Sequence, residues 1–163
     1  MNEPMAVGLG ELKGSRDPEA QLVCYGLGSC IGLALWDLRS RVGAMAHIVL
    51  PDSALSRGPV VQPAKWADTA LPAALELMAG MGASRTTTVA RIAGGARMLN
   101  VVGAGSRLDI GARNIEAVRE VLRRHDMRLT AEDVAGTWGR TLTLHVGTGR
   151  LVVSTAGRGE QEL

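Results

Sequence analysis

The residues best suited to carry out chemistry lie in one stretch of the chain, residues 23–51. This stretch contains both cysteines, Cys24 and Cys30, and a histidine, His47, that is set in an apolar run. A cysteine thiolate is a nucleophile, and a neighbouring imidazole can take the proton from the thiol. Cys30 and His47 would therefore form a nucleophile–base pair if the fold held them within reach of each other.

Two apolar runs, 31–36 and 42–50, predict the strands of a hairpin that would bring this pair together. In one register Cys30 lies directly across from His47. If the turn centre shifts by one residue, His47 faces Gly32, and Cys30 is one diagonal step away. Both registers put the two side chains on the same face, because side-chain direction alternates along a strand. The intermediate register would separate them unless a bulge restored the match.

A glycine-rich segment, 26–29, leads directly into Cys30. Its backbone can turn sharply, so N–H groups in this loop, with Gly28 and Ser29 as candidates, can point at a developing oxyanion. Gly32, on the same face as Cys30, would leave room for a substrate. The structural alternative is that a free cysteine and a lone histidine in apolar strands are core residues. The pattern by itself leaves both interpretations open.

The composition predicts a single domain, residues 1–163, that is long enough to bury a core without disulfides or metals. Apolar residues make up 46% of the chain but include no phenylalanine, so the core must consist mainly of aliphatic side chains and methionine. The net charge of +2 and the lack of a long basic run argue against a nucleic-acid partner. We expect Arg123, Arg124 and Arg140 to be ordinary solvated side chains.

The sequence also indicates where the protein works. No segment approaches the ~20 apolar residues of a membrane helix, and the N-terminus lacks the pattern of a signal peptide. Two cysteines in a chain of this length do not indicate a disulfide framework, so we expect a cytoplasmic protein without membrane insertion. Two cysteines and scattered histidines make a poor metal site, so we expect no metal and no cofactor.

The remaining pattern predicts an α+β fold, a layered α/β sandwich of mixed or antiparallel β-sheets with two main helices outside. Helices are expected at 64–81 and at 114–125, the second with Asn114 as its N-cap. Residues 52–63 would form a loop long enough to cover the site. The glycines at 103–105 favour close backbone packing rather than an anion site. Further strands are expected at 6–12, 21–25, 86–93, 128–134, 140–146 and 150–155.

Several motifs follow one another along the chain. The two most specific are Gly26-Leu27-Gly28-Ser29-Cys30 and Gly43-Ala44-Met45-Ala46-His47. The others are Leu50-Pro51, Lys65-Trp66-Ala67-Asp68-Thr69-Ala70, Ala93-Gly94-Gly95-Ala96, Ile110-Gly111-Ala112-Arg113-Asn114, Glu132-Asp133 and Gly159-Glu160-Gln161. Together, in this order and at this spacing, they resemble the CheD family of chemoreceptor glutamine deamidases over nearly the whole chain. The resemblance implies an α/β sandwich of the kind shared with deamidating bacterial toxins.

The resemblance also implies a function and a mechanism. Cys30, deprotonated by His47, would attack the carboxamide of a glutamine in a methyl-accepting chemotaxis receptor. Backbone amides of Ser29 and Cys30 would hold the oxyanion. Water would release the thioester as glutamate, and the same chemistry would hydrolyse a glutamyl methyl ester. The expected partners are these receptors, with CheC, where it is encoded, and phosphorylated CheY.

Cys24 is the one departure from the family pattern, because members usually carry threonine there, six residues before the nucleophile, as a third catalytic residue. Three outcomes are open: Cys24 orients His47 less well, a backbone carbonyl takes over, or the enzyme is weakened. A disulfide bond between Cys24 and Cys30 could also block the nucleophile. Two alternative functions therefore remain open. One is a catalytically weak or inactive interaction protein that binds receptor or CheC, and the other is a hydrolase of another amide.

If the pair is active, the sequence makes one prediction about its resting state. His47 should lower the pKa of the Cys30 thiol, because a basic partner favours the thiolate. Cys30 should then be alkylated faster at neutral pH than an unperturbed thiol.

Overall fold

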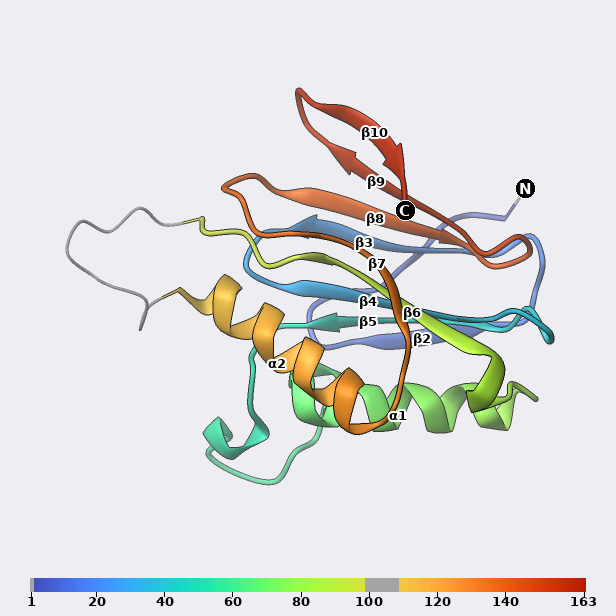
Figure 1. The fold of residues 1–163 in the computed structure, drawn as a ribbon, viewed down its shortest axis with the longest axis horizontal. Helices are drawn as coiled ribbons and strands as arrows, with labels where there is room; N and C mark the ends of the chain where they lie inside the picture. Colours follow the sequence, from blue (N-terminus) through green and yellow to red (C-terminus); the bar gives the residue numbers. More distant parts are fainter. Residues whose placement is uncertain (1, 99–108) are drawn as a thin grey trace.

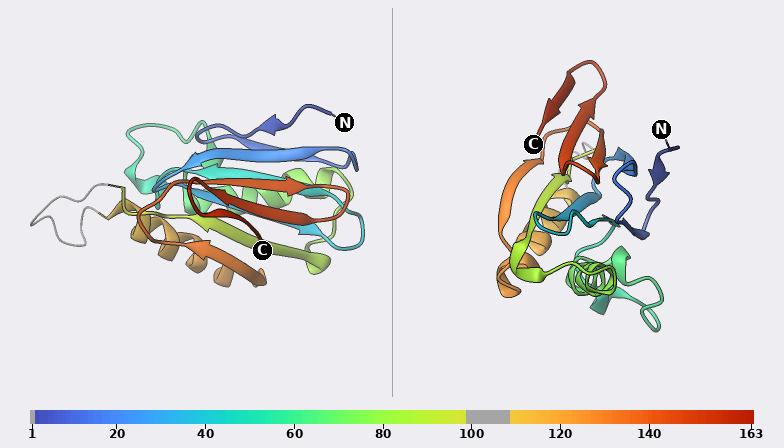
Figure 2. Two further views of the ribbon diagram at one scale, coloured as in Figure 1. Left: turned by 90° about the horizontal axis from the view of Figure 1, so that it is seen from above. Right: turned by 90° about the vertical axis from the view of Figure 1, so that its right-hand side faces the viewer.

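Two five-stranded sheets lie face to face, and two helices cover the outer face of one of them (Figures 1 and 2). This arrangement is seen in a computed structural model that describes residues 2–98 and 109–163. The glycines at 103–105, for which close backbone packing was predicted, lie outside the described residues. Both sheets contain parallel and antiparallel strand pairs. The predicted α+β class, with mixed sheets and two main helices outside, is confirmed.

The first sheet has the strand order β1-β3-β8-β9-β10. These strands are, in that order, Met5–Ala6, Gln21–Leu27, Arg140–His145, Arg150–Thr155 and Gly159–Glu162. The second sheet has the order β2-β5-β4-β6-β7, formed by Leu12–Ser15, Gly43–Ile48, Ile31–Asp37, Thr88–Gly94 and Leu129–Val134. The helices are α1 (Ala67–Gly80) and α2 (Ile110–Arg124), and the short 3-10 helices are η1 (Ser53–Leu55), η2 (Pro63–Lys65) and η3 (Arg85–Thr87).

The second sheet is buried on both faces, which explains the continuous apolar runs of its central strands. On β4, Ile31, Leu33 and Leu35 pack toward the helices, whereas Ala34 packs toward the first sheet. Helix α1 packs against β5 and β2, and α2 packs against β4 and β7. The β4–β5 hairpin is therefore held from both sides, as a rigid platform for the residues at its ends.

The prediction of a single strand at 6–12 is wrong. Its first part belongs to β1, which pairs with β3 in the first sheet, and its last residue begins β2, which pairs with β5 in the second. The chain changes sheets in a turn at residues 7–11. Gly10 in this turn has a φ of 73°, a left-handed conformation that glycine adopts without strain.

Two helix boundaries also differ from the prediction. Helix α1 begins at Ala67 rather than at residue 64, because η2 occupies the preceding turn. Helix α2 begins four residues earlier than predicted, and Asp109 is its N-cap, with its carboxylate accepting a hydrogen bond from the Ala112 N–H at 2.9 Å. Asn114 therefore does not cap the helix but lies inside it, fully buried.

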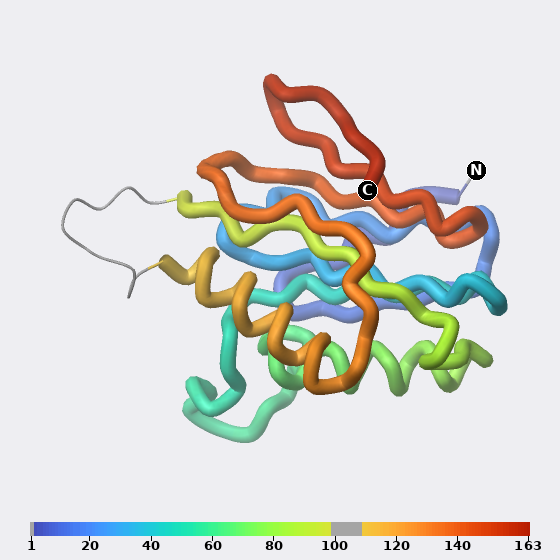
Figure 3. The backbone as a smooth tube through the Cα atoms, in the orientation of Figure 1, coloured from blue at the N-terminus to red at the C-terminus, as the bar shows by residue number. Residues whose placement is uncertain are grey.

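The chain between β5 and α1, residues 49–66, leaves the sandwich at one end and loops outward before it enters α1 (teal to green in Figure 3). Its two ends are joined, because Val49 and Leu50 both donate their N–H groups to the Lys65 carbonyl, at 2.9 and 3.0 Å. Of the helices in the described ranges, none has the length and apolar character needed to cross a membrane.

Candidate active site

The β4–β5 hairpin adopts the second of the two predicted registers, with His47 opposite Gly32. Cys30 lies two residues before Gly32, so it is on the same face and one diagonal step from His47. This face is directed toward the first sheet. Cys30 packs against the apolar cluster between the sheets, and His47 is only 3% exposed. The fold thus brings the predicted pair onto one face at the same end of the hairpin.

The turn at residues 7–11 holds His47 in place. The His47 N–H donates to the Glu11 carbonyl at 3.0 Å, and the Gly10 N–H donates to the His47 carbonyl at 2.9 Å. The imidazole Nδ1 lies 2.9 Å from the carbonyl oxygen of Val7. Both the main chain and the ring of the histidine are therefore fixed by the backbone of one turn. In the sequence, the only local sign of this turn is the pair of glycines that flank residue 9.

The contact with Val7 determines which nitrogen of His47 can act as a base. A carbonyl oxygen only accepts hydrogen bonds, so Nδ1 carries the hydrogen of the neutral ring and Nε2 keeps its lone pair. Nε2 is buried and has no hydrogen-bond partner among the residues that the structure describes, so the Cys30 thiol is not bonded to it in this state. Of the outcomes left open for the orientation of His47, a backbone carbonyl is the one observed.

The loop before Cys30 is fixed by the end of β6 and the residues after it. The Gly95 N–H donates to the Cys30 carbonyl at 2.9 Å, and the Ala96 N–H donates to the Gly28 carbonyl at 2.8 Å. Gly94 has a φ of 117°, and a Cβ atom there would lie 2.1 Å from the Cys30 carbonyl oxygen. Only glycine permits this approach, so β6 forms a tight backbone support for the nucleophile.

Cys30 itself has two properties that bear on catalysis. Its N–H and that of Ser29 have no acceptor within the described part of the chain, so both are unused as hydrogen-bond donors there. Burial raises the pKa of the Cys30 thiol, which is the opposite of the predicted lowering by His47. The thiol is therefore protonated at neutral pH, so a base would have to remove its proton before it could act as a nucleophile.

Cys24 on β3 is fully buried, opposite Leu142 on β8. Burial, with a smaller contribution from the nearby Cys30, raises the pKa of Cys24 to about 12, so Cys24 is an unreactive core thiol. Neither cysteine forms a disulfide. The space predicted above Gly32 is also filled, because a Cβ atom there would lie 2.8 Å from Leu142 and 3.0 Å from Leu27. Gly32 lets the sheets approach each other, so the prediction that it admits a substrate is wrong.

Asn114 belongs to the site, although the sequence pattern predicted a helix cap. Its Nδ2 donates to the carbonyl oxygens of Ser29 and Val49, each at 2.9 Å. One amide on α2 thus contacts the residue before Cys30 and the residue that directly follows β5, the strand of His47. The only sequence signal for this role was the motif that ends at Asn114, because neither carbonyl can be identified from local pattern.

Arg140 was predicted to be solvated but is 2% exposed. Its guanidinium donates to the Gly94 carbonyl at 3.4 Å and pairs with Asp133 at 3.2 Å. Asp133 in turn accepts a hydrogen bond from the Gln161 side chain at 2.7 Å. A polar chain therefore runs from the C-terminal strand β10 to Gly94, which contacts the nucleophile loop.

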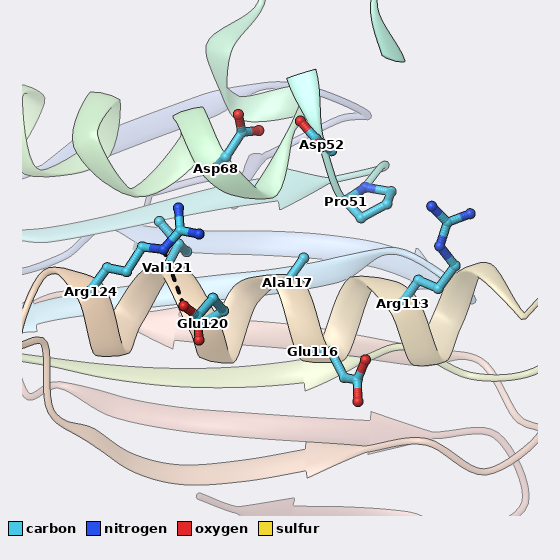
Figure 4. A pocket seen from close by; sticks show the side chains of 9 residues that line it. All are labelled: Pro51, Asp52, Asp68, Arg113, Glu116, Ala117, Glu120, Val121 and Arg124. Atoms are coloured by element: carbon cyan, nitrogen blue, oxygen red, sulfur yellow. Dashed lines mark hydrogen bonds and ion pairs between the residues drawn. The ribbon is translucent and has the colours of Figure 1, made fainter. Parts of the chain in front are cut away.

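Two cavities lie beside helix α2. A cavity of about 130 Å³ lies beside Ser29, between Met98 and the first residues of α2. A larger cavity of about 440 Å³ lies between α1 and α2, where Arg113 and Arg124 line one side and Asp68 lies across from them (Figure 4). Among the described residues, neither lining includes a cysteine or a histidine. The smaller cavity includes Ser29, the residue before Cys30, so we place the candidate active site beside it.

Comparison with known proteins defines the class to which the chain belongs. Residues 49–155 match the CheD family model, which is described as CheD chemotactic sensory transduction. The matched range begins just after His47, but similarity to individual relatives extends over the whole site.

The chain is 59% identical to the probable chemoreceptor glutamine deamidase CheD of Symbiobacterium thermophilum over 158 residues, which cover 97% of this chain and 96% of the relative. It is 40% identical to the chemoreceptor glutamine deamidase CheD of Halalkalibacterium halodurans over the full length of both chains. It is also 40% identical to the probable chemoreceptor glutamine deamidase CheD of Clostridium botulinum over 96% of each chain. The chain belongs to the CheD family, as its motifs predicted.

Proposed function

We propose that this protein deamidates glutamine side chains of methyl-accepting chemotaxis receptors, with Cys30 as the nucleophile and His47 as the base. The names of the relatives support the reaction and the class of substrate. The observation that carries the residue assignment is the contact between Nδ1 of His47 and the Val7 carbonyl. In the neutral ring this contact places the hydrogen on Nδ1 and the lone pair on Nε2, on the face that carries Cys30.

The proposed reaction has two halves. Nε2 of His47 takes the proton from the Cys30 thiol as Sγ attacks the carboxamide carbon, and the N–H groups of Ser29 and Cys30 bind the oxyanion that forms. The imidazolium then gives its proton to the leaving nitrogen, so that ammonia departs and a thioester remains. Nε2 next takes a proton from water, whose hydroxide attacks the thioester. The C–S bond then breaks, and the imidazolium returns its proton to Sγ as glutamate is released and the thiol is restored. The reaction requires no cofactor.

The same steps would hydrolyse a glutamyl methyl ester, because only the leaving group differs. Following the family resemblance, the proposed partners besides the receptors are CheC, where it is encoded, and phosphorylated CheY. The proposed location is the cytoplasm, where the glutamines of the receptor bundles are accessible.

The second candidate is a weakly active or inactive interaction protein that binds receptor or CheC. Two observations favour it: Cys24 occupies the position where the family carries threonine, and Nε2 of His47 is not bonded to the Cys30 thiol. The absence of threonine at position 24 matters less because Val7 already holds the ring of His47. A missing hydrogen bond between base and nucleophile is common in unliganded enzymes, whose catalytic hydrogen bonds tighten when substrate binds.

Ammonia release from a purified receptor fragment tests the proposed function. Cys30→Ala should reduce the rate to the uncatalysed background, because the nucleophile is lost, whereas its melting temperature should stay close to that of the wild type. The matched control is Cys24→Ala, which removes the other thiol and should retain turnover. Undiminished ammonia release from Cys30→Ala would contradict the assignment. A wild-type protein that binds the fragment without releasing ammonia would support the interaction protein.

A further inference from the structure

We infer that Asn114 is a positioning residue that orients the peptide bond between Ser29 and Cys30 and joins it to Val49, the residue after the strand of His47. The inference deepens the proposed function, because it concerns the same nucleophile and the same base. It rests on the contacts of one buried amide and on the planarity of the peptide bond.

Asn114 lies in the second turn of α2 and is fully buried. Its Nδ2 donates to the Ser29 and Val49 carbonyls, both at 2.9 Å. Because carbonyl oxygens only accept hydrogen bonds, the NH₂ group and not Oδ1 must face them, so the orientation of the amide follows from its partners. The helix thereby holds two segments that are far apart in the sequence, one just before Cys30 and one just after His47.

The bond to Ser29 determines where the Cys30 N–H points. The peptide unit is planar and trans, so the C=O of Ser29 and the N–H of Cys30 point in opposite directions. When Asn114 holds the carbonyl on the α2 side, the N–H is directed away from the helix. The Gly95 N–H holds the carbonyl of Cys30 at 2.9 Å, so the peptide units on both sides of the nucleophile are fixed. Asn114 therefore sets the direction of the proposed oxyanion donor without contacting the substrate.

The surroundings of Asn114 separate this role from ordinary packing. The other buried residues on this face of α2 are apolar or glycine: Gly111, Ile115, Val118, Val121 and Leu122. The Oδ1 atom of Asn114 is buried and has no hydrogen-bond partner among the described residues. A buried acceptor without a partner destabilises a fold, so packing alone does not account for an amide here. The two hydrogen bonds of Nδ2 are what the amide contributes to the site.

The test compares Asn114→Ala with Val118→Ala, a matched change one turn further along the same buried face of α2. Three quantities are measured: kcat and KM on a receptor fragment, the melting temperature, and the rates at which iodoacetamide alkylates Cys30 and Cys24, read by peptide mass spectrometry. Cys24 is an internal reporter, because a core thiol reacts only if the whole fold opens.

In Asn114→Ala we expect kcat to fall about tenfold and KM to stay within about twofold, because the oxyanion donor is misdirected while the substrate surface is unchanged. We also expect Cys30 to be alkylated at least about threefold faster, since its loop is released, while Cys24 stays unmodified. Val118→Ala should lower the melting temperature and leave kcat and both alkylation rates near wild type. Asn114→Ser, whose short side chain cannot bridge both carbonyls, should behave like Asn114→Ala.

Cys30 alkylation and kcat that match those of Val118→Ala, in both Asn114 variants, would overturn the inference. Faster modification of Cys24 together with Cys30 would also overturn it, because the effect would then be general unfolding. The alkylation rates can be measured without catalytic turnover of a substrate. The wild type could release no ammonia while Cys30, but not Cys24, is still alkylated faster in the Asn114 variants. In that case the proposed function fails while the positioning role stands.

Discussion

At the scale of single residues, the ring of His47 is held by the main chain and not by the side chain at position 24. Position 24, where the resemblance to the family implies threonine, holds a fully buried thiol with a pKa raised to about 12. The imidazole is instead oriented by the main-chain carbonyl of Val7 at 2.9 Å. A backbone carbonyl cannot be removed by a side-chain substitution, so the orientation of His47 should tolerate changes at position 24.

We therefore predict that Cys24→Thr changes kcat less than about threefold under reducing conditions, because Val7 already holds Nδ1. The variant should also lose about 1–2 kcal/mol of stability, since the hydroxyl would be buried among apolar side chains without a partner. Turnover and denaturant unfolding measure the two effects. Cys24→Val, which has the shape of threonine without the hydroxyl, is the control. A gain of about tenfold in Cys24→Thr but not in Cys24→Val would show that the hydroxyl was missing after all.

The protonation state of Cys30 leads to a second prediction. Because burial raises the pKa of this thiol, its alkylation rate should rise through the alkaline range, above the ordinary thiol pKa of about 8.5. His47→Asn should shift this profile little, because in the proposed reaction His47 takes the proton only during turnover and is not an ion-pair partner at rest. The same variant should abolish ammonia release. An inflection near neutral pH that disappears in His47→Asn would instead indicate a preformed thiolate–imidazolium pair.

At the scale of elements, three short segments outside the central strands shape the site. The turn at 7–11 holds His47, the residues after β6 hold the nucleophile loop, and the segment 49–66 continues from the strand of His47. The last of these exposes apolar side chains, with Val61 87% exposed and Leu55 52% exposed. Such residues in a loop that begins beside the site are suited to contact a helical substrate.

We predict that replacing Val60 and Val61 with serine lowers kcat/KM on a receptor fragment about tenfold, because apolar contacts to the substrate helix are lost. Hydrolysis of a small amide, which does not reach this loop, should change less than about twofold. Leu38→Ser is the matched control, since Leu38 is 50% exposed but lies in the turn at the far end of the hairpin. Equal losses on both substrates would mean that the loop has only a structural role.

At the scale of the whole molecule, the hairpin is anchored at the end away from Cys30 by Asp37. Its carboxylate is 1% exposed and accepts hydrogen bonds from four groups. These groups are the Thr87 hydroxyl, the Arg39 N–H, the Ser40 hydroxyl and the Ser84 N–H, at 2.6 to 2.9 Å. Burial alone would raise the pKa of Asp37, but these bonds outweigh it and hold the pKa well below its usual range.

This arrangement predicts how stability depends on pH. The folded state favours the Asp37 carboxylate, so its contribution is fully present above the unfolded pKa of about 3.9 and is lost as the pH falls from there toward the lower folded pKa. Asp37→Asn should cost on the order of 3 kcal/mol at neutral pH, because one oxygen is replaced by a donor facing other donors. The same substitution should also reduce the decrease in the free energy of unfolding between neutral and acidic pH. Denaturant unfolding from pH 7 to pH 3 measures both effects, with Asp126→Asn at an exposed site as the control. Parallel pH curves for wild type and Asp37→Asn would contradict the prediction.

The sequence by itself determined the properties that depend on neighbouring residues. Alternation of side chains along two apolar runs placed Cys30 and His47 on one face in either of two registers, and the same patterns predicted the α+β class with two outer helices. Motif order and spacing predicted the family. These features could be predicted because strand periodicity and turn chemistry act over a few residues.

Only the tertiary structure decided what surrounds the pair. The partner of the His47 ring is 40 residues away in the chain, and Asn114 reaches Ser29 across 85 residues. Leu142 fills the space above Gly32, and Arg140 is buried against Gly94, although local pattern indicated open space for the first and solvent for the second. The pKa of Cys30 is raised for the same reason, because burial depends on which layers stack and not on the residues beside it in the sequence.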